Sequence, residues 1–270
     1  MLKLKAGLYS LLFILLSFAC QRENIDKIRM NPDLDYRYEK AIAFYEAGDY
    51  QKAQYLLEDL MGLVRGSGKA EKVYYYYAST HHRMRNFTFS SYYFRQFYNT
   101  FPNSEFAEEA LFLAAESSRK LSPNFRLTQE DTEEAIEGYQ FFVNMYPLSD
   151  RVSLCNEQID LLRAKLETKA LEAAKGYYKR SHYQAAVHSF NNLLLDFPDT
   201  QEAPYIRYMI IKSSFGYAEK SILSKQVERF EEVIEKAKIF ERKHSDSRYG
   251  SEVRNMINIS KQRIKRLRNE

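Results

Sequence analysis

The sequence has no tryptophan and only two cysteines, Cys20 and Cys155. Glycan-uptake proteins favour tryptophan as a platform for sugar rings, so its absence argues against that class. Cys20 is expected to carry lipid, as explained below, which leaves Cys155 without a partner. A disulfide framework is then impossible even in an oxidising compartment. We read Cys155 as a small, buried, apolar residue of a helix.

Motifs for catalysis and metal binding are also missing. His81 and His82 are adjacent, so they point about 100° apart on a helix, and the other three histidines stand alone. There is no phosphate-binding loop, dinucleotide fingerprint or nucleophile elbow. Adjacent acids such as Glu108 and Glu109 fall early in expected helices, where they interact favourably with the helix dipole. The sequence predicts a binding protein without catalytic residues, metal or cofactor.

Charge is low for a chain of this length. The formal net charge is +4, and an amino-terminal segment that we expect to be removed carries two lysines and no acid, which leaves +2 (4 − 2). Nucleic-acid binding needs a concentrated basic footprint, so we expect no nucleic-acid partner. The 22 tyrosines and 18 phenylalanines are more informative, because helical repeats use rings both to pack and to hold peptides.

The amino terminus has the pattern of a secretory signal. Lys3 and Lys5 precede an apolar run, residues 8–18, that is too short for an ordinary transmembrane helix. Cys20 follows Ala19 where cleavage is expected, which resembles the bacterial lipoprotein signal, although Ser17 and Phe18 depart from its usual residues. In that signal the cysteine is diacylated and becomes the first residue. We therefore expect a signal peptide at 1–19 and a membrane anchor at Cys20.

A repeated stripe organises the rest of the chain. In residues 177–200 a ring at Tyr183 is followed at offsets 3, 7 and 10 by Ala186, Phe190 and Leu193, and Pro198 ends the run. These offsets lie on one face of an α-helix, and proline stops it. The same pattern recurs four times: Tyr50–Ala53–Leu57–Leu60, Phe87–Ser90–Phe94–Phe97, Thr132–Ala135–Tyr139–Phe142 and Phe230–Val233–Ala237–Phe240.

A second helix is expected before each stripe. Twelve residues before the small position stand further small residues, each expected inside a helix: Ala41, Ala78, Ala174 and Ser221. Short turns such as 48–50 and 181–183 would join the paired helices. Helix–turn–helix units of about 34 residues are typical of tetratricopeptide repeats. The sequence thus predicts an all-α solenoid of about five such pairs plus a carboxy-terminal helix.

The expected helix boundaries follow from these patterns. We predict pairs at 34–47 with 50–64, 70–84 with 87–100, 105–120 with 129–145, 151–180 with 182–196 and 202–220 with 223–243, and a last helix at 247–268. Residues 21–33 are polar and are expected to be a tether. Residues 121–130 form a longer loop than a repeat turn needs, and such loops often carry contacts.

Two groups of residues are candidates for binding. The run 74–77 contains four tyrosines, which cannot all face one way on a helix. Tyr75 or Tyr76, with Arg83, could line a groove for an extended peptide, and the alternative is that all these rings pack between repeats. The carboxy-terminal residues are rich in basic side chains and could meet an acidic partner or anionic headgroups, or form an ordinary solvated face. The partner candidates are Lys261, Arg263, Lys265 and Arg266.

The chain resembles the BamD family of outer-membrane protein assembly lipoproteins. The residues that carry the resemblance are 177–186 with Phe197–Pro198–Asp199–Thr200, similar to that family's fourth repeat, and 123–149, similar to its third. The resemblance implies a non-catalytic scaffold held to the outer membrane by its lipid and facing the periplasm. It also implies that amino-terminal repeats receive unfolded outer-membrane protein precursors. Carboxy-terminal repeats would bind the periplasmic domains of a BamA-like barrel subunit.

The expected domain organisation combines both arguments. Residues 20–33 are the lipidated tether, 34–150 hold repeats 1–3 for precursor binding, and 151–270 hold repeats 4–5 with the terminal helix for scaffolding. An alternative within binding proteins is another outer-membrane repeat lipoprotein that serves cell-wall or glycan-uptake complexes. An enzyme such as a wall hydrolase would need clustered acid–base residues, which the repeats do not offer.

Overall fold

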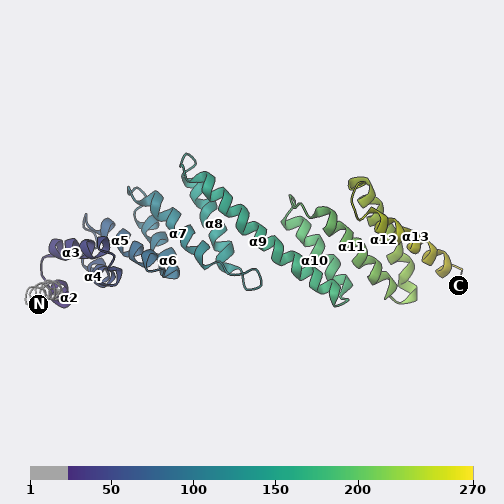
Figure 1. The fold of residues 1–270 in the computed structure, drawn as a ribbon, viewed down its shortest axis with the longest axis horizontal. Coiled ribbons are helices and arrows are strands. Elements are labelled where there is room, and N and C mark those ends of the chain that lie inside the picture. The colour runs from purple at the N-terminus through teal and green to yellow at the C-terminus, as the bar shows by residue number, and fades with distance from the viewer. Residues whose placement is uncertain (1–23, 270) are drawn as a thin grey trace, which may run out of the picture. The chain divides into compact units, whose positions relative to one another are not determined.

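The repeated stripe forms the second helix of each pair. The computed structural model describes residues 24–269, and within them twelve helices and no strands follow one another (Figure 1). The helices are α2 (Ile25–Arg29), α3 (Leu34–Glu46), α4 (Tyr50–Leu63), α5 (Ala70–Arg83), α6 (Phe87–Thr100), α7 (Ala107–Leu121), α8 (Glu130–Met145), α9 (Val152–Lys179), α10 (Tyr183–Asp196), α11 (Ala203–Glu219), α12 (Leu223–Lys243) and α13 (Gly250–Leu267). Five pairs and a terminal helix confirm the all-α solenoid class.

The described residues fall into two compact units. The first holds 24–123 and 130–159, and the second holds 124–129 and 160–269. The boundary lies inside α9, which is continuous over 28 residues, or about 42 Å at 1.5 Å per residue. Within each unit, helices pack mainly against their neighbours in sequence, from α3 to α8 and from α10 to α13. This is the quasi-linear packing of a repeat protein.

The core of the first unit is built from the predicted stripe. Its buried positions in α4, α6 and α8 are Ala53, Leu57, Leu60, Ser90, Phe94, Phe97, Ala135, Tyr139 and Phe142. The small residues Ala41 of α3 and Ala78 of α5 are also fully buried. Rings and leucines therefore fill the space between paired helices, and alanine or serine occupies the points of closest approach.

In the second unit the same positions enclose a more aliphatic core. Ala186, Phe190 and Leu193 of α10 and Val233, Ala237 and Phe240 of α12 are buried around α11. That helix contributes Ile206 and Ile211, and α13 contributes Val253 and Ile257 from the other side. Because α11 is packed on several sides, its buried residues extend around most of the helix.

Three of the turns within pairs share one backbone conformation. Gly48, Arg85 and Ser181 each lie two residues before the second helix of their pair, with φ of 79°, 62° and 61°. Only glycine adopts this left-handed conformation without steric cost. Arg85 and Ser181 are held there because the following backbone N–H donates to a carbonyl of the previous helix, at 2.9 Å from Asn86 to His81 and 3.0 Å from His182 to Tyr177.

The third pair has the longer connection that the sequence predicts. Residues 122–129 join α7 to α8, and the buried Gln129 side chain donates to the carbonyls of Asn124 (2.9 Å) and Leu127 (3.0 Å). In the second unit, Lys169 of α9 also donates to the Leu127 carbonyl at 2.5 Å. The loop is therefore closed by its own amide side chain and fastened to α9.

The prediction for Ser221 is wrong. This residue does not lie inside a helix, since it falls in the turn between α11 and α12. The physical reason is that α12 begins at Leu223, seven residues or about two turns before Phe230, so the turn shifts toward the amino terminus. The small residue that packs against Phe230 is instead Ala218 of α11.

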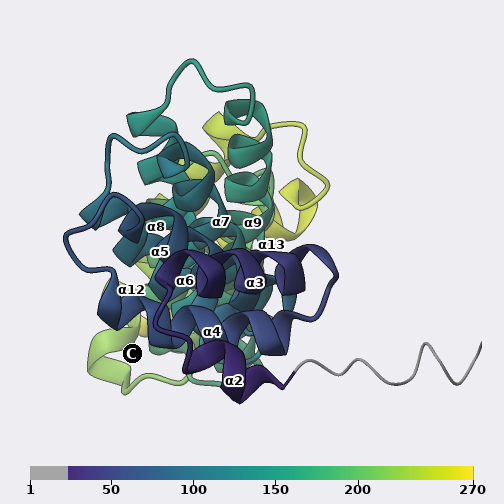
Figure 2. The same ribbon diagram turned by 90° about the vertical axis from the view of Figure 1, so that its left-hand side faces the viewer.

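Part of the segment expected as a tether is helical. Asn24 caps α2 by accepting from the Asp26 N–H at 3.0 Å, and Ile28 is buried against the first pair. Arg29 Nε lies 3.2 Å from the Asp59 carboxylate of α4. Figure 2 shows α2 beside α4, which it contacts along with α3. The folded part of the chain thus begins before Leu34.

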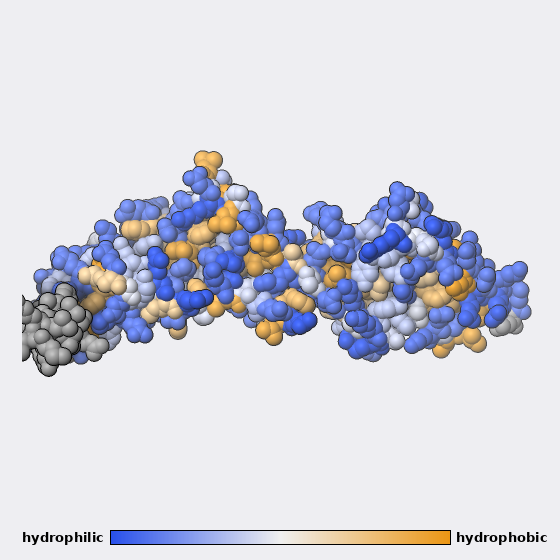
Figure 3. Space-filling model, viewed as in Figure 1, coloured by the Kyte–Doolittle hydropathy of each residue, from blue (hydrophilic) through white to orange (hydrophobic). Residues whose placement is uncertain are grey.

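The surface of the described residues is mainly hydrophilic, with separate hydrophobic patches on the face shown in Figure 3. Leu148, in the turn between α8 and α9, is 96% exposed and stands apart from the core. Among the described helices, none combines the length and the apolar character required to cross a membrane.

Two glycine substitutions should have opposite effects on stability. An added Cβ at Gly216 of α11 would lie 2.8 Å from the Tyr183 ring, whereas one at Gly62 of α4 would meet nothing within 4 Å. We expect Gly216→Ala to lower the free energy of unfolding by about 1–3 kcal/mol through overpacking. Gly62→Ala should raise it by up to about 1 kcal/mol, because alanine favours helix.

Thermal unfolding followed by circular dichroism measures both changes. The matched control is the Gly62→Ala variant itself, since it makes the same substitution in a helix with free space. An unchanged or higher midpoint for Gly216→Ala would contradict the close contact between α10 and α11.

Candidate functional site

Four consecutive tyrosines of α5 spread around the helix, as their spacing requires. Tyr77 is buried, and Tyr74, Tyr75 and Tyr76 are half-buried. Tyr74 meets Phe101 edge-on, with ring centroids 5.8 Å apart. Both rings and Thr100 line a hollow of about 530 Å³. The run therefore serves two purposes, because some rings fill the core and others reach the surface.

Tyr75 is packed against two neighbouring rings. It stacks on Phe106 with centroids 4.4 Å apart and planes at 21°, and it meets Phe97 edge-on at 5.7 Å. Burial, and after it the nearby Glu109, raises the pKa of Tyr75 to about 12. The phenol is therefore neutral at physiological pH and can donate a hydrogen bond.

Tyr76 and Arg83 meet at a third ring, Tyr45 of α3. Tyr76 lies edge-on to Tyr45 with centroids 5.2 Å apart, and Tyr45 is edge-on to Tyr50 at 5.4 Å. The Arg83 Nε donates to the Tyr45 hydroxyl at 3.3 Å, and this bond raises the pKa of the guanidinium further. Tyr75 joins the group through Tyr76, at 5.6 Å. We call Tyr45, Tyr75, Tyr76 and Arg83 the α5 ring cluster.

Acidic side chains surround the α5 ring cluster. Burial, followed by Tyr45, Glu46 and Glu105, raises the pKa of Tyr76. Glu109 acts on Tyr75 in the same direction. The cluster can thus offer apolar ring faces, neutral phenol donors and one guanidinium, with no nucleophile or paired acid and base among these residues. Such a surface suits binding of a peptide better than chemistry on it.

Sequence reasoning missed Tyr45, although a signal for it was present. Tyr45 follows the buried Ala41 by four residues, so both lie on the stripe of α3 that faces its neighbours. The run of four tyrosines drew attention to α5 alone. An inspection of equivalent positions in the first helices would have added Tyr45.

The predicted partner residues lie on the exposed side of α13. The opposite side packs inward through Val253, Ile257 and Ile264. The four basic residues named from the sequence are exposed: Lys261, Arg263, Lys265 and Arg266. Arg263 lies 3.9 Å from Glu219, a long ion pair between exposed side chains, which contributes little stability. These cations are therefore presented to solvent by the last helix.

The structure describes only one of the two cysteines. Cys20 lies outside the described residues. Cys155 is buried and free, and burial raises the pKa of its thiol to about 11, as expected for an apolar helix residue. Within residues 24–269 no group of histidine, cysteine and acidic side chains could hold a metal ion.

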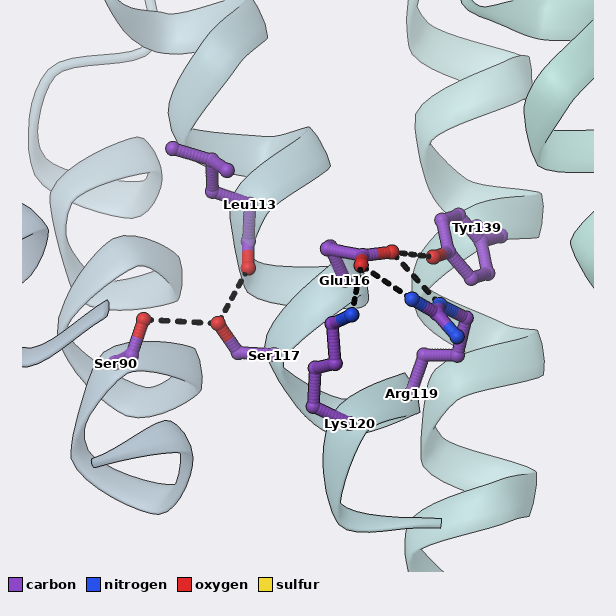
Figure 4. A network of polar contacts seen from close by, with 7 residues as sticks. All are labelled: Ser90, Leu113, Glu116, Ser117, Arg119, Lys120 and Tyr139. Carbon is purple, nitrogen blue, oxygen red and sulfur yellow. Dashed lines mark hydrogen bonds and ion pairs between the residues drawn. The ribbon is translucent and has the colours of Figure 1, made fainter. Parts of the chain in front are cut away.

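A polar network fastens the two helices of the third pair, α7 and α8, to each other. Glu116 of α7 accepts from Arg119 Nε at 2.8 Å and from the buried Tyr139 hydroxyl of α8 at 2.6 Å, and Lys120 Nζ lies 3.5 Å away. Figure 4 shows this arrangement together with Ser90 of α6, whose hydroxyl lies 2.8 Å from that of Ser117. Polar bonds thus link three consecutive helices, α6, α7 and α8.

Burial acts to raise the pKa of Glu116, but the hydrogen bonds from Arg119 and Tyr139 outweigh it and hold the pKa below the ordinary 4.5 of a glutamate. Burial also raises the pKa of Tyr139, with its bond to Glu116 as the second cause. The network therefore contains a carboxylate, a guanidinium and a neutral phenol at physiological pH.

Fold and surface together define a tetratricopeptide-type protein with a half-buried ring cluster in its first unit. Comparison with known families identifies it further, since a model of the YfiO family, described as outer membrane lipoprotein, matches residues 32–212. This match covers about two thirds of the 270 residues. The chain belongs to that family, and the resemblance to BamD proteins is confirmed.

Two curated relatives carry the BamD name. The putative outer membrane protein assembly factor BamD of Aquifex aeolicus (strain VF5) is 25% identical over 204 residues, which cover 74% of this chain. The outer membrane protein assembly factor BamD of Pasteurella multocida (strain Pm70) is 23% identical over 164 residues, or 57% of this chain. The chain spans 66% and 63% of the lengths of these relatives, just under two thirds.

Among solved structures, the chain is similar to the TPR2AB domain of yeast Sti1 in a complex with pHSP90. The likeness covers 84% of this chain and 98% of that one, at 11% identity and a TM-score of 0.38. No argument rests on a likeness of that size.

The Glu116 network makes stability depend on pH. Because the folded pKa of Glu116 is depressed, its contribution is fully present above about pH 4.5 and is lost as pH falls through the folded value. We expect Glu116→Gln to lower the free energy of unfolding at pH 7 by about 1–2 kcal/mol, because the charge-assisted bonds are lost. At a pH well below 4.5 the variant and the parent should converge.

Thermal midpoints across this pH range test the effect. Glu137→Gln, at an exposed position of α8, makes the same change and should leave the midpoint nearly unchanged. A difference between Glu116→Gln and the parent that stays constant down to low pH would contradict the role assigned to the carboxylate.

Proposed function

We propose that this chain is a non-catalytic scaffold of outer-membrane protein assembly, held to the outer membrane by lipid at Cys20 and facing the periplasm. The family match over residues 32–212 is the observation that carries the proposal. The two relatives that are named assembly factors support it. The chemistry of the exposed surfaces is compatible with it, because rings and cations suit binding.

Precursors are received by the repeats within residues 34–150. An unfolded outer-membrane protein precursor that ends in alternating apolar and aromatic residues needs apolar ring faces and donors for its backbone carbonyls. The α5 ring cluster offers both, since Tyr45, Tyr75 and Tyr76 expose part of their rings and Arg83 is exposed. The rings are already fixed by contacts with one another, which lowers the entropic cost of binding.

The repeats within residues 151–270 bind the periplasmic domains of a BamA-like barrel subunit. The basic face of α13 supports this role, because its exposed lysines and arginines would attract an acidic patch on a folded partner. The exposed side of α13 is polar and charged.

Substitutions in the α5 ring cluster should weaken binding of a precursor peptide. We expect Arg83→Ala and Tyr76→Leu each to reduce the affinity for a labelled peptide with an alternating apolar and aromatic carboxy terminus by about five- to tenfold. The reason is that each removes a donor or an edge of the ring group around Tyr45. Fluorescence anisotropy of the full chain in detergent measures the change.

Matched controls lie in the same unit. Arg65→Ala removes an exposed arginine, and Tyr92→Leu removes a ring of α6 that is 60% exposed. Neither belongs to the α5 ring cluster, so both should leave the affinity unchanged. Equal losses in controls and cluster variants would refute the assignment of precursor binding to this cluster.

Charge reversal on α13 should release the barrel subunit. We expect a chain with Lys261→Glu, Lys265→Glu and Arg266→Glu to recover at least about tenfold less of a large barrel protein from its own membranes, because like charges repel the acidic patch. Mild-detergent purification of the tagged, acylated chain followed by mass spectrometry gives the amounts.

Two further chains complete that experiment. Truncation of residues 201–270 should abolish recovery of the barrel protein, and Cys20→Ala should remove the chain from the membrane fraction. If transport receptors or wall enzymes were recovered instead, with no barrel protein, the proposal would be wrong and a role in cell-wall or glycan-uptake complexes would take its place.

A further inference from the structure

The second unit contains a tyrosine-lined groove that the proposed function does not use. A hollow of about 460 Å³ lies between α9 and α11. Buried Met209 lies at its base, and Tyr178, Tyr205 and Tyr208 form its apolar walls. Tyr249, at the start of α13, continues the ring surface, since it stacks on Tyr208 with centroids 4.6 Å apart and planes at 12°. We call this hollow the α9–α11 groove.

Lysine side chains lie over the rings of the groove. Lys175 Nζ is 5.4 Å from the centroid of Tyr205, and Lys212 Nζ is 5.1 Å from that of Tyr208. Burial is the first cause that raises the pKa of both Tyr205 and Tyr208. The rings are therefore neutral, and the Tyr205 ring attracts the Lys175 ammonium by cation–π attraction, whereas the Lys212 ammonium is held at the Tyr208 hydroxyl.

A chain of hydrogen bonds fixes one wall. Lys212 Nζ donates to the Tyr208 hydroxyl at 2.6 Å, and that hydroxyl donates to the Glu252 carboxylate of α13 at 2.5 Å. The Lys212 ammonium is also 3.7 Å from Glu252, whose side chain is 59% exposed. An exposed ion pair of that length is weak, so the Lys212 ammonium can also attract an incoming carboxylate while Glu252 keeps its hydrogen bond from Tyr208.

Charge in the groove is unbalanced toward the positive. Its lining contains three lysines, Lys175, Lys179 and Lys212, against Glu172 in the lining and Glu252 at the rim. Lys175 pairs with Glu172 at 2.8 Å and Lys212 is near Glu252, whereas Lys179 is exposed and makes no hydrogen bond or ion pair with the described residues. Lys179 therefore shares the Glu172 carboxylate with Lys175 at longer range and forms no ion pair with the described residues.

We propose that the α9–α11 groove binds an extended peptide segment in which acidic residues alternate with apolar ones. The acidic side chains would meet Lys179 and Lys212 by charge complementarity, and the apolar side chains would lie against the tyrosine faces and Met209. Alternation follows from the extended chain, in which successive side chains point to opposite sides. Ring faces and cations are arranged along two neighbouring helices, which suits a strand-like ligand.

The shape favours a peptide over a membrane surface. The rings line a hollow between helices and are half-buried or buried, so a flat layer of headgroups would reach only its rim. Anionic headgroups would be attracted by the lysines, but Tyr205 and Tyr208 lie inside the hollow, where a flat layer of headgroups does not reach them. A peptide uses both features of the groove.

This groove shares no residue with the α5 ring cluster or with the four basic residues of α13, although it lies in the half that the proposed function assigns to the barrel subunit. If the α5 ring cluster did not bind precursors, the proposal for the α9–α11 groove would still stand. Its test therefore uses a different peptide and different variants.

The experiment compares two capped, fluorescein-labelled peptides on the full chain in detergent. One alternates leucine with aspartate, and the other has asparagine at each aspartate. We expect the aspartate peptide to bind and Lys179→Glu to weaken it by about tenfold, because attraction becomes repulsion at a few ångströms. The asparagine peptide should bind at least about tenfold more weakly for the same reason. Added salt should weaken binding of the aspartate peptide, because it screens the attraction between charges.

A matched control separates the groove from general charge. Lys238→Glu makes the same change at an exposed position of α12 outside the groove and should leave affinity unchanged. Tyr205→Leu removes one ring from the wall of the groove and should weaken binding of both peptides. Equal binding of the two peptides, equal effects of Lys179→Glu and Lys238→Glu, or Lys179-dependent binding to anionic phosphatidylglycerol vesicles without peptide binding would each overturn the proposal.

Discussion

Close approach of neighbouring helices at small side chains sets the spacing of the helices within each unit. Ser90 of α6 meets Ser117 of α7 through hydroxyls 2.8 Å apart, and a Cβ on Gly138 of α8 would lie 3.0 Å from that of Ala115. In the second unit Gly216 of α11 lies under the Tyr183 ring. Larger residues at these points would separate the helices and open the contacts of the rings, because packed interiors do not deform freely.

That constraint explains which parts of the fold could be predicted. A stripe at offsets 3, 7 and 10 needs a small residue and two bulky ones on one helix face, so Ala186, Phe190 and Leu193 alone locate α10 and its buried side. The prediction for Ser221 failed because an offset of twelve residues assumes that the second helix starts at the first position of the stripe. In this pair α12 begins at Leu223, about two turns before that position. The helix bounds predicted from the sequence, 202–220 and 223–243, already leave Ser221 in the turn, and the structure agrees with those bounds rather than with the fixed offset.

The binding surfaces were less predictable, for a related reason. The α5 ring cluster depends on Tyr45 from a different helix, and the Glu116 network depends on Tyr139, which the sequence marked only as a packing ring. The α9–α11 groove combines Tyr178, Tyr205 and Tyr249 from three helices with no local motif. Sequence periodicity predicts which face of a helix is buried, but not which exposed side chains of neighbouring helices meet.

Tyrosine allows the two surfaces to use rings in different electrostatic settings. Near the α5 ring cluster the titratable neighbours of Tyr75 and Tyr76 are mainly acids, Glu105 and Glu109 among them, whereas lysines lie over Tyr205 and Tyr208. Burial is the first cause that raises the pKa in all four, so the phenols stay neutral in both settings. Selectivity between ligands then follows from the surrounding charges rather than from the rings. We therefore expect an acidic segment to prefer the second surface to the first, because acids surround Tyr75 and Tyr76 whereas lysines line the α9–α11 groove.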